Sequence, residues 1–225
     1  MQQLPLPDCV PAGSAVWQLA LDLQAPPAAE DVQLLSDDER SRIARLRRPA
    51  DRMRSIAGRA ALRRLLGHAL SVAPQRLRFG AGAHGKPQLL SHEGPAFNVA
   101  HSGCYVLVAL GGDTIGALGV DVEQRDSSMD TTALAPHALT LEEQLALAAS
   151  RHDTTIFYDY WSAKEAALKA LGVGVSEHLQ QVTVLRQPGR RLQLRHQMAH
   201  WPPLQACLLP APVQYSAALA WHTKD

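Results

Sequence analysis

The stretch Leu118-Gly119-Val120-Asp121-Val122-Glu123 carries valines at 120 and 122 and acids at 121 and 123. Because side chains alternate between the two faces of a β-strand, the pattern predicts a half-buried strand with both carboxylates on one face, about 7 Å apart. Like charges this close disfavour each other's ionised forms. A bound divalent cation is therefore the functional interpretation, and a solvated strand edge is the structural one.

A similar stretch, Leu19-Ala-Leu-Asp22-Leu-Gln24, precedes it in the chain and also predicts a strand. Four further pairs of similar segments follow in the same order: two capping-box patterns, two helical runs that each end at a glycine suited to a left-handed cap, and two pairs of strand-like segments. These pairs are Ser36–Glu39 with Thr140–Glu143, Ala60–Gly67 with Ala166–Gly172, Leu77–Phe79 with Val182–Val184, and Tyr105–Leu110 with Tyr215–Ala220. The shared order predicts an internal duplication.

The expected fold class is α+β, with two similar halves related by a pseudo-twofold axis. The boundary falls near Gly111-Gly-Asp113, where two glycines mark a turn, which divides the chain into residues 1–113 and 114–225. The proline-rich stretch 201–212 is expected to be a surface connection.

Composition predicts a soluble, cytoplasmic protein with no membrane partner. No run approaches the roughly eighteen consecutive apolar residues of a membrane span, and residues 1–10 lack the features of a secretory signal. The cysteines, Cys9, Cys104 and Cys207, are odd in number and far apart, which argues against a disulfide framework or a cysteine zinc site.

A second segment with chemical potential is the predicted helix 157–169. Trp161, Glu165 and Lys169 are spaced by four residues, so they share one stripe of the helix. An acid and a base on one face suit a reactive site. The same order of charges also suits an ordinary surface ion pair, which would stabilise the helix by about 0.3 kcal/mol.

An arginine-rich region points to an anionic ligand. Between Arg40 and Arg78 there are twelve arginines and a single acid, Asp51, although the net charge of the chain is only +1. The loop 82–87 and the segment 97–103 add backbone freedom and donors, and Arg45, Arg54, Arg59 and Ser55 can add more, since guanidinium groups match phosphate oxygens. The alternative is a solvated helix face. Nucleic acid is not expected, because zinc-finger spacing, an RNP-like aromatic motif and an overall basic charge are all missing.

Four motifs in order carry a family resemblance: Gly85-Lys86-Pro87, then Phe97-Asn-Val-Ala-His101-Ser-Gly103, then Gly119-Val-Asp121-Val-Glu123, then Trp161-Ser-Ala-Lys-Glu165-Ala-Ala-Leu-Lys169. Over about residues 36–175 the chain resembles the Sfp-type 4'-phosphopantetheinyl transferases. The form of the last motif is similar to the larger, pseudo-dimeric class rather than to the short trimeric holo-acyl-carrier synthases.

The resemblance implies the 4'-phosphopantetheinyl transferase fold and Mg²⁺-dependent transfer of the 4'-phosphopantetheine arm of coenzyme A to a carrier-protein serine. It implies Asp121, Glu123 and Glu165 as Mg²⁺ ligands, Glu165 and Lys169 as catalytic residues, and Lys169 as the group that neutralises the pyrophosphate. The implied coenzyme A contacts are His101 on phosphate, Lys86 and Pro87 at the adenine end, and Arg42, Arg45 and Ser55 near the ribose 3'-phosphate. Ala100 departs from the family pattern, because many relatives have serine before the histidine.

The implied partner is an apo acyl or peptidyl carrier protein, with residues 124–137 as a docking edge, and fused halves suggest a monomer. Two other functions are compatible with these residues. A Mg²⁺-dependent phosphodiesterase or nuclease also uses carboxylates, and would release 3',5'-ADP without a carrier. A non-catalytic module would hold coenzyme A or a carrier without reaction.

Overall fold

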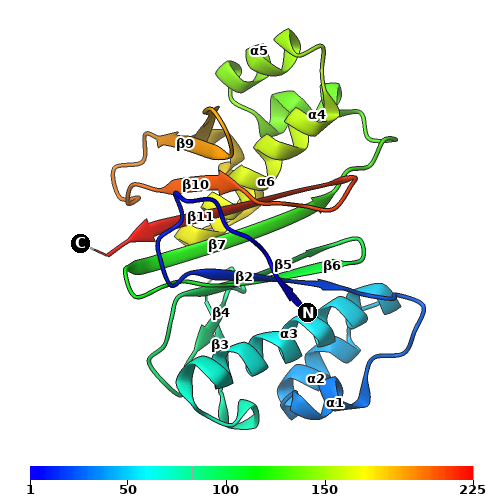
Figure 1. Cartoon of the computed structure of the whole chain (residues 1–225). Coiled ribbons are helices and arrows are strands. Elements are labelled where there is room, and N and C mark those ends of the chain that lie inside the picture. The colour runs from blue at the N-terminus through cyan, green and yellow to red at the C-terminus, as the bar shows by residue number, and fades with distance from the viewer. Residues whose placement is uncertain (83, 225) are drawn as a thin grey trace.

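Figure 1 shows the computed structural model of the chain, which describes residues 1–82 and 84–224; Ala83 and Asp225 lie outside the described residues. The first part contains β1 (Gln2–Gln3), β2 (Ala15–Ala20), α1 (Ala29–Leu34), α2 (Asp37–Ala44), α3 (Pro49–Leu70), η1 (Pro74–Arg76), β3 (Phe79–Ala81), β4 (Pro87–Leu89), β5 (Phe97–Ser102) and β6 (Tyr105–Leu110). The second part contains β7 (Ile115–Gln124), α4 (Thr131–Ala138), α5 (Leu141–Ala149), α6 (Thr154–Leu171), α7 (Val175–His178), η2 (Leu179–Gln181), β8 (Val182–Arg186), β9 (Arg191–His196), β10 (Gln205–Leu208) and β11 (Tyr215–Thr223).

The two parts repeat one order of elements. In each, a first strand is followed by three helices, a 3₁₀ turn and four strands, and α7 and β1 are additions to this order. The sheets have the orders β1-β2-β6-β5 and β7-β11-β10-β9-β8, while β3 and β4 form a separate hairpin. In both parts the first long strand pairs antiparallel with the last, β2 with β6 and β7 with β11. The expected mixture of helices and strands is confirmed.

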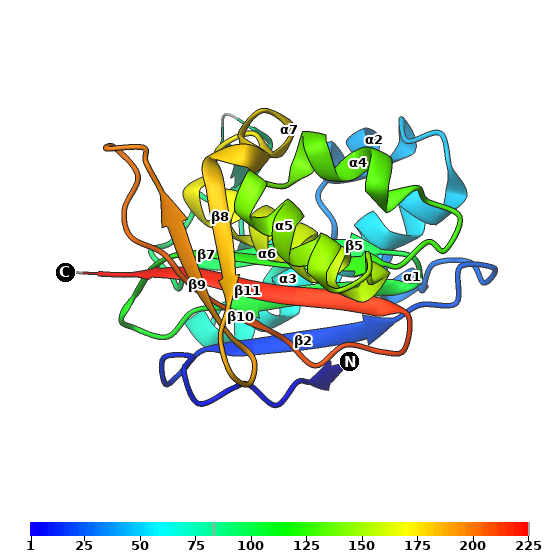
Figure 2. The same cartoon turned by 90° about the horizontal axis from the view of Figure 1, so that it is seen from above.

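The two sheets lie between two groups of helices (Figure 1). One apolar cluster, which includes Val16, Leu107, Val120 and Leu219, fills the space between the sheets. The outer face of the first sheet packs on α3, and the outer face of the second sheet packs on α6. The second sheet twists strongly, so β8 and β9 cross the direction of β11 when the molecule is seen from above (Figure 2).

The two sheets meet where the edge strands β5 and β7 lie beside each other. Side chains of the first part occupy the positions that a neighbouring strand would take along β7. Asn98 Oδ1 accepts from Val120 N at 3.0 Å, and Ser102 Oγ accepts from Gln124 N at 3.0 Å. The ammonium of Lys86 donates to Leu118 O at 3.1 Å on the same edge. We call these three contacts the seam.

The capping box predicted at Ser36 opens α2, and its acid also reaches the core. Glu39 Oε2 accepts from Ser36 N at 2.8 Å and from the guanidinium of Arg63 at 2.8 and 3.0 Å. Arg63, on α3, is 2% exposed and donates to the carbonyls of Pro74 and Leu77 as well. The start of α2 is thereby tied to the middle of α3.

The second part repeats this arrangement with different residues. Glu143 Oε2 accepts from Thr140 N at 2.7 Å at the predicted start of α5, and it lies 2.6 Å from Lys164 Nζ on α6. Lys164 also donates to the carbonyls of Ala138 and Leu179. A buried ion pair therefore anchors the long helix in each part, because an unpaired buried charge is strongly destabilising.

Three boundaries differ from the sequence predictions. The first strand covers Ala15–Ala20 instead of 19–24, because Asp22 Oδ1 accepts from Gln24 N and turns the chain. Helix α3 passes through Gly67 and ends at Leu70, with Ser71 as its C-cap. A Cβ at Gly67 would lie 2.7 Å from Val72 O, so this glycine allows a close approach and is not a cap. The proline-rich stretch 201–212 contains β10, and is not wholly a surface connection.

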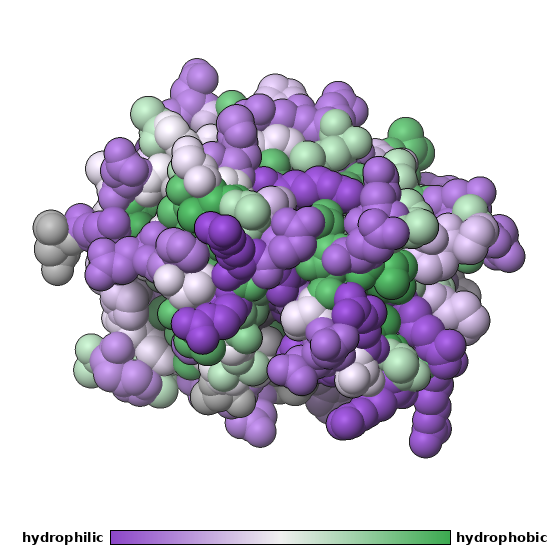
Figure 3. All heavy atoms as spheres, turned by 90° about the horizontal axis from the view of Figure 1, so that it is seen from below, coloured by the Kyte–Doolittle hydropathy of each residue, from purple (hydrophilic) through white to green (hydrophobic). Residues whose placement is uncertain are grey.

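A fourth boundary also differs: the strand predicted at Leu77–Phe79 is β3, Phe79–Ala81, because Leu77 still caps the 3₁₀ turn η1. Gly172 caps α6 with φ 74°, as predicted. The predicted division after residue 113 lies in the turn between β6 and β7 and stays a prediction. Within the described part of the chain, no helix is long and apolar enough to cross a membrane. The face on the side of α1–α3 is mostly hydrophilic with smaller hydrophobic areas (Figure 3), and most arginines of the 40–78 region are exposed.

The buried pair gives a stability prediction. Replacing Lys164 by Met leaves Glu143 buried without its counter-charge, and we expect the free energy of unfolding to fall by about 3–5 kcal/mol in a urea titration. Arg195→Met is the control, because Arg195 pairs with Glu142 on the surface with side chains 51% and 57% exposed. It should change the free energy by less than about 1 kcal/mol. Similar small effects of both substitutions would contradict the anchoring role.

Candidate functional site

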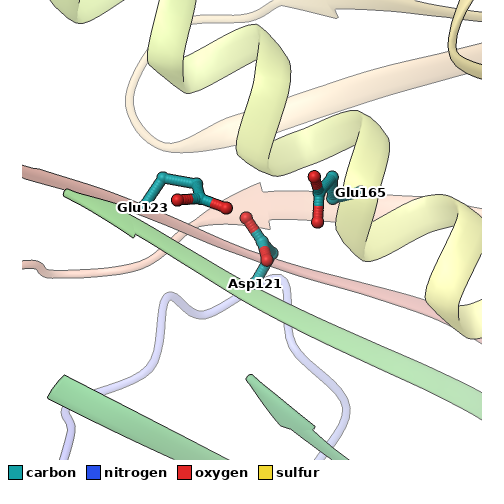
Figure 4. Close-up of side chains that lie close together, drawn as sticks. All are labelled: Asp121, Glu123 and Glu165. Carbon is teal, nitrogen blue, oxygen red and sulfur yellow. The ribbon is translucent and has the colours of Figure 1, made fainter. Parts of the chain in front are cut away.

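The structure brings three predicted carboxylates together. Alternation along β7 places Asp121 and Glu123 on the face toward α6, as expected, and Glu165 approaches from that helix (Figure 4). Ligand atoms of the three side chains all lie within 4.8 Å of one another. We call this group the carboxylate cluster.

Lys169 is the cation at the cluster. Its Nζ lies 2.5 Å from Asp121 Oδ1 and 3.2 Å from Glu165 Oε2. One ammonium leaves the three carboxylates undercompensated, and the buried Oδ2 of Asp121 has no hydrogen-bond partner among the described residues. A surplus of hard oxygen ligands with an unpartnered atom fits a hard divalent cation such as Mg²⁺.

The electrostatics of the cluster agree with this fit. Burial, and then the charge of Asp121, raise the pKa of Glu123 to about 7, although Ser102 Oγ donates to its carboxylate at 2.8 Å. Burial and Asp121 raise the pKa of Glu165 in the same way. Burial alone lowers the pKa of Lys169, but Asp121 and Glu165 raise it above its usual value. The cluster is therefore short of positive charge.

A cavity of about 270 Å³ lies in the first part, between α2, α3 and β5. Of the residues predicted to contact coenzyme A, Arg42, Ser55, Pro87 and His101 line it. Period-two alternation explains the place of His101, because the odd residues of β5 face α3 while Asn98 and Ser102 face the seam. His101 keeps exposed surface, yet burial of its ring lowers its pKa, and the charges of Arg54 and Lys169 lower it further.

Arg59 also lines this cavity and is only 16% exposed. Its guanidinium lies 4.8 Å from the ring centre of Phe79 and 3.3 Å from Glu39 Oε1, and its buried Nη1 has no partner among the described residues. Burial lowers its pKa despite Glu39. A donor held in this way suits an anionic guest.

Two predicted contacts lie elsewhere. Arg45 is exposed at the C-cap of α2 and is not among the residues that line the cavity, because the helix ends there. The ammonium of Lys86 points into the second part, where three carbonyl groups accept from it. Lys86 lines a neighbouring cavity, which shares Pro87 and Val99 with the first one and reaches Lys169.

Sequence reasoning missed why the strand and the helix approach so closely. A Cβ at Gly119 would lie 2.0 Å from Ala166 O and 2.4 Å from Ala170 N, so only glycine permits this contact between β7 and α6. The contact lies two residues before Asp121 and one residue after Glu165. A glycine directly before an acidic strand pattern is the signal that was available.

The chain was compared with known proteins. The model of the 4'-phosphopantetheinyl transferase superfamily matches residues 117–220, and the model of the 4'-phosphopantetheinyl transferase N-terminal region matches residues 27–111. The chain is 42% identical over 153 residues to slr0495 of Synechocystis sp., a candidate 4'-phosphopantetheinyl transferase; the match covers 66% of this chain and 61% of that protein. It is 31% identical over 185 residues to the 4'-phosphopantetheinyl transferase HetI of Nostoc sp., covering 80% of this chain and 77% of HetI.

Among solved structures, the holo-[acyl-carrier-protein] synthase of Thermotoga maritima matches 49% of this chain and 64% of its own, with a TM-score of 0.41 and 20% identity.

The contact at Gly119 gives a prediction about the geometry of the cluster. In Gly119→Ala, the new methyl group pushes α6 away from β7, and we expect a loss of about 1–3 kcal/mol in the free energy of unfolding. Gly116→Ala is the matched control on the same strand, because its nearest neighbour would be a Lys224 side-chain carbon at 3.4 Å. Chemical denaturation of both variants should separate them, and equal stability would contradict the close approach.

Proposed function

This chain belongs to the 4'-phosphopantetheinyl transferase superfamily, and from that premise we propose that it transfers the phosphopantetheine arm of coenzyme A to a serine of an apo carrier protein. One observation carries the proposal. Lys169, which contacts Asp121 and Glu165 of the carboxylate cluster, lines a cavity that shares Pro87 and Val99 with the cavity lined by Arg42, Arg54 and Arg59. A polyanion with two separated phosphate positions fits that layout.

In this proposal Asp121, Glu123 and Glu165 hold Mg²⁺, which supplies charge neutralisation to the pyrophosphate. Residues 1–113 bind mainly the nucleotide end, through Arg42, Ser55 and His101, and residues 114–225 supply the acids. Lys169 is held by Asp121 and Glu165, so its ammonium is already oriented beside the position of the pyrophosphate. Since one chain supplies both the cavity and the cluster, a monomer is sufficient.

The reaction follows from this placement. The serine hydroxyl oxygen forms a bond to the phosphorus that carries pantetheine, the pyrophosphate P–O bond breaks, and 3',5'-ADP leaves with the bonding electrons. Lys169 compensates the charge that develops on the leaving group, and His101 can donate a hydrogen bond to a phosphate oxygen. Glu165 is the candidate acceptor of the serine proton, because its carboxylate lies beside the reacting position.

The carrier protein is proposed to approach along residues 124–137, which continue directly from Glu123 at the end of β7. This edge has exposed apolar surface at Met129, which is 40% exposed, and a cation in Arg125. Met129 and Arg125 would complement the acidic helix that is expected beside a carrier serine, although Asp126 and Asp130 are also exposed on this edge.

The central test mixes the protein with several purified apo carriers, coenzyme A and Mg²⁺, and measures the intact mass of each carrier. A phosphopantetheine added to serine supports the proposal. Release of 3',5'-ADP without any carrier indicates the phosphodiesterase alternative, and coenzyme A binding without either product indicates the non-catalytic module.

Glu165→Gln tests the role of the carboxylate. We expect a folded protein that binds coenzyme A but turns over about 100-fold more slowly or worse, because the proton acceptor is lost. Glu142→Gln, an exposed acid on α5, is the control and should retain full turnover. Turnover of Glu165→Gln close to the unmodified rate at saturating Mg²⁺ would exclude both roles of Glu165.

Arg42→Ala tests the nucleotide cavity. Loss of a charged contact to phosphate is worth about 1.5–3 kcal/mol, so we expect KM for coenzyme A to rise roughly tenfold to a hundredfold. The effect should shrink with 3'-dephospho-coenzyme A as substrate, because the phosphate that Arg42 contacts is missing. Arg45→Ala is the matched control, because Arg45 is equally exposed near the same end of α2 but is not among the residues that line the cavity. An equal effect of Arg42→Ala on both substrates would contradict the contact.

A further inference from the structure

Lys86 reaches from the first part of the chain into the second. It lies in the connection between β3 and β4, which is closed by hydrogen bonds from Gly82 N to Lys86 O at 2.8 Å and from Gly85 N to Gly82 O at 3.0 Å. The positive φ of Gly85, 76°, allows this tight turn. The partly buried ammonium donates to Lys169 O at 2.6 Å, to Leu118 O at 3.1 Å and to Ala170 O at 3.2 Å.

The three acceptors belong to the two elements that carry the carboxylate cluster. The carbonyls of Lys169 and Ala170 lie in the last turn of α6, where the helix dipole is negative; Lys169 O also accepts from Gly172 N at the cap, at 3.3 Å. Leu118 O lies on the β7 edge that forms the seam. A single cation therefore compensates the end of α6 and the edge of β7 together.

These contacts lie over the close approach at Gly119. Gly119 directly follows the acceptor Leu118. It packs against the backbone of Ala170, whose carbonyl accepts from Lys86. The hairpin also touches the turn after α6, because a Cβ at Gly174 would lie 3.2 Å from His84 Nδ1. The first part of the chain thus fixes the relative position of β7 and α6 from outside the cluster.

We propose that Lys86 is a positioning residue for the transfer reaction: it holds the end of α6 against β7, so that Lys169 and Glu165 stay aligned with Asp121. This inference rests on the proposed function. It goes beyond the role that the family resemblance implies, in which Lys86 lies by the adenine end of coenzyme A.

The two roles predict different kinetics. Without the ammonium, the carbonyl groups lose their donor and the helix end can move, so Lys86→Met should lower kcat at least tenfold at saturating coenzyme A. KM and the Kd of coenzyme A from calorimetry should stay within about threefold. Lys86→Gln keeps an N–H donor without the charge and should lie between Lys86→Met and the unmodified protein. Lys224→Met is the control, because Lys224 Nζ also donates to a carbonyl, Asp113 O at 2.9 Å, on the surface.

Hydrogen exchange gives a second measurement that needs no carrier and no turnover. In Lys86→Met, the amides of residues 115–124 and 165–175 should exchange faster than in the unmodified protein, while the exchange of residues 49–70 should not change. In the control Lys224→Met, no amide should change its exchange rate. A rise in KM with kcat unchanged would assign Lys86 to the nucleotide and overturn the proposal, as would unchanged exchange. If the exchange result holds but the unmodified protein transfers nothing to any carrier, the clamp on α6 stands and the proposed function fails.

Discussion

The carboxylate cluster depends on how closely α6 approaches β7 at Gly119. A methyl group there would lie 2.0 Å from Ala166 O, which is far inside van der Waals contact. Because of this approach, the acids of a strand and the acid of a helix come within 4.8 Å of one another. The attraction of Lys169 for Asp121 then acts between α6 and β7, and its contact with Glu165 lies within α6. The backbones of β7 and α6 set the distances between the three carboxylates, and the charge of Lys169 orients their side chains.

Two kinds of polar contact hold α6 in place beside β7: a buried ion pair at its middle and hydrogen bonds to carbonyl groups at its end. Inside the second part, the buried Lys164 ties α6 to the start of α5 through Glu143. From the first part, Lys86 compensates the end of the same helix and the edge of β7. A helix held at its middle and at its end cannot easily shift along its axis. Lys169 follows Lys164 by five residues, and its own carbonyl accepts from Lys86, so its position is well determined.

Local patterns in the sequence correctly predicted the features that depend on neighbouring residues, such as strand faces and helix starts. Period-two alternation placed Asp121 and Glu123 on one face, and capping boxes located the starts of α2 and α5. Features that depend on residues outside the local pattern were not predictable. Gly67 resembles a cap in isolation, yet its role is set by Val72 and Pro74, which follow the helix. The acceptors of Lys86 on α6 lie more than eighty residues away in the chain, and no spacing rule identifies them.

The repeated order of elements raises the question of why the described residues contain one carboxylate cluster and not two. Strand pairing gives the answer. Ala20 pairs with Tyr105 as Gln124 pairs with Tyr215, so Trp17 and Leu19 stand in β2 where Asp121 and Glu123 stand in β7. Trp17 and Leu19 pack against the apolar cluster under α3. The first sheet thus has core side chains at the positions where the second sheet has acids. In the first part, the anionic ligand is instead expected in the arginine-lined cavity between α2, α3 and β5.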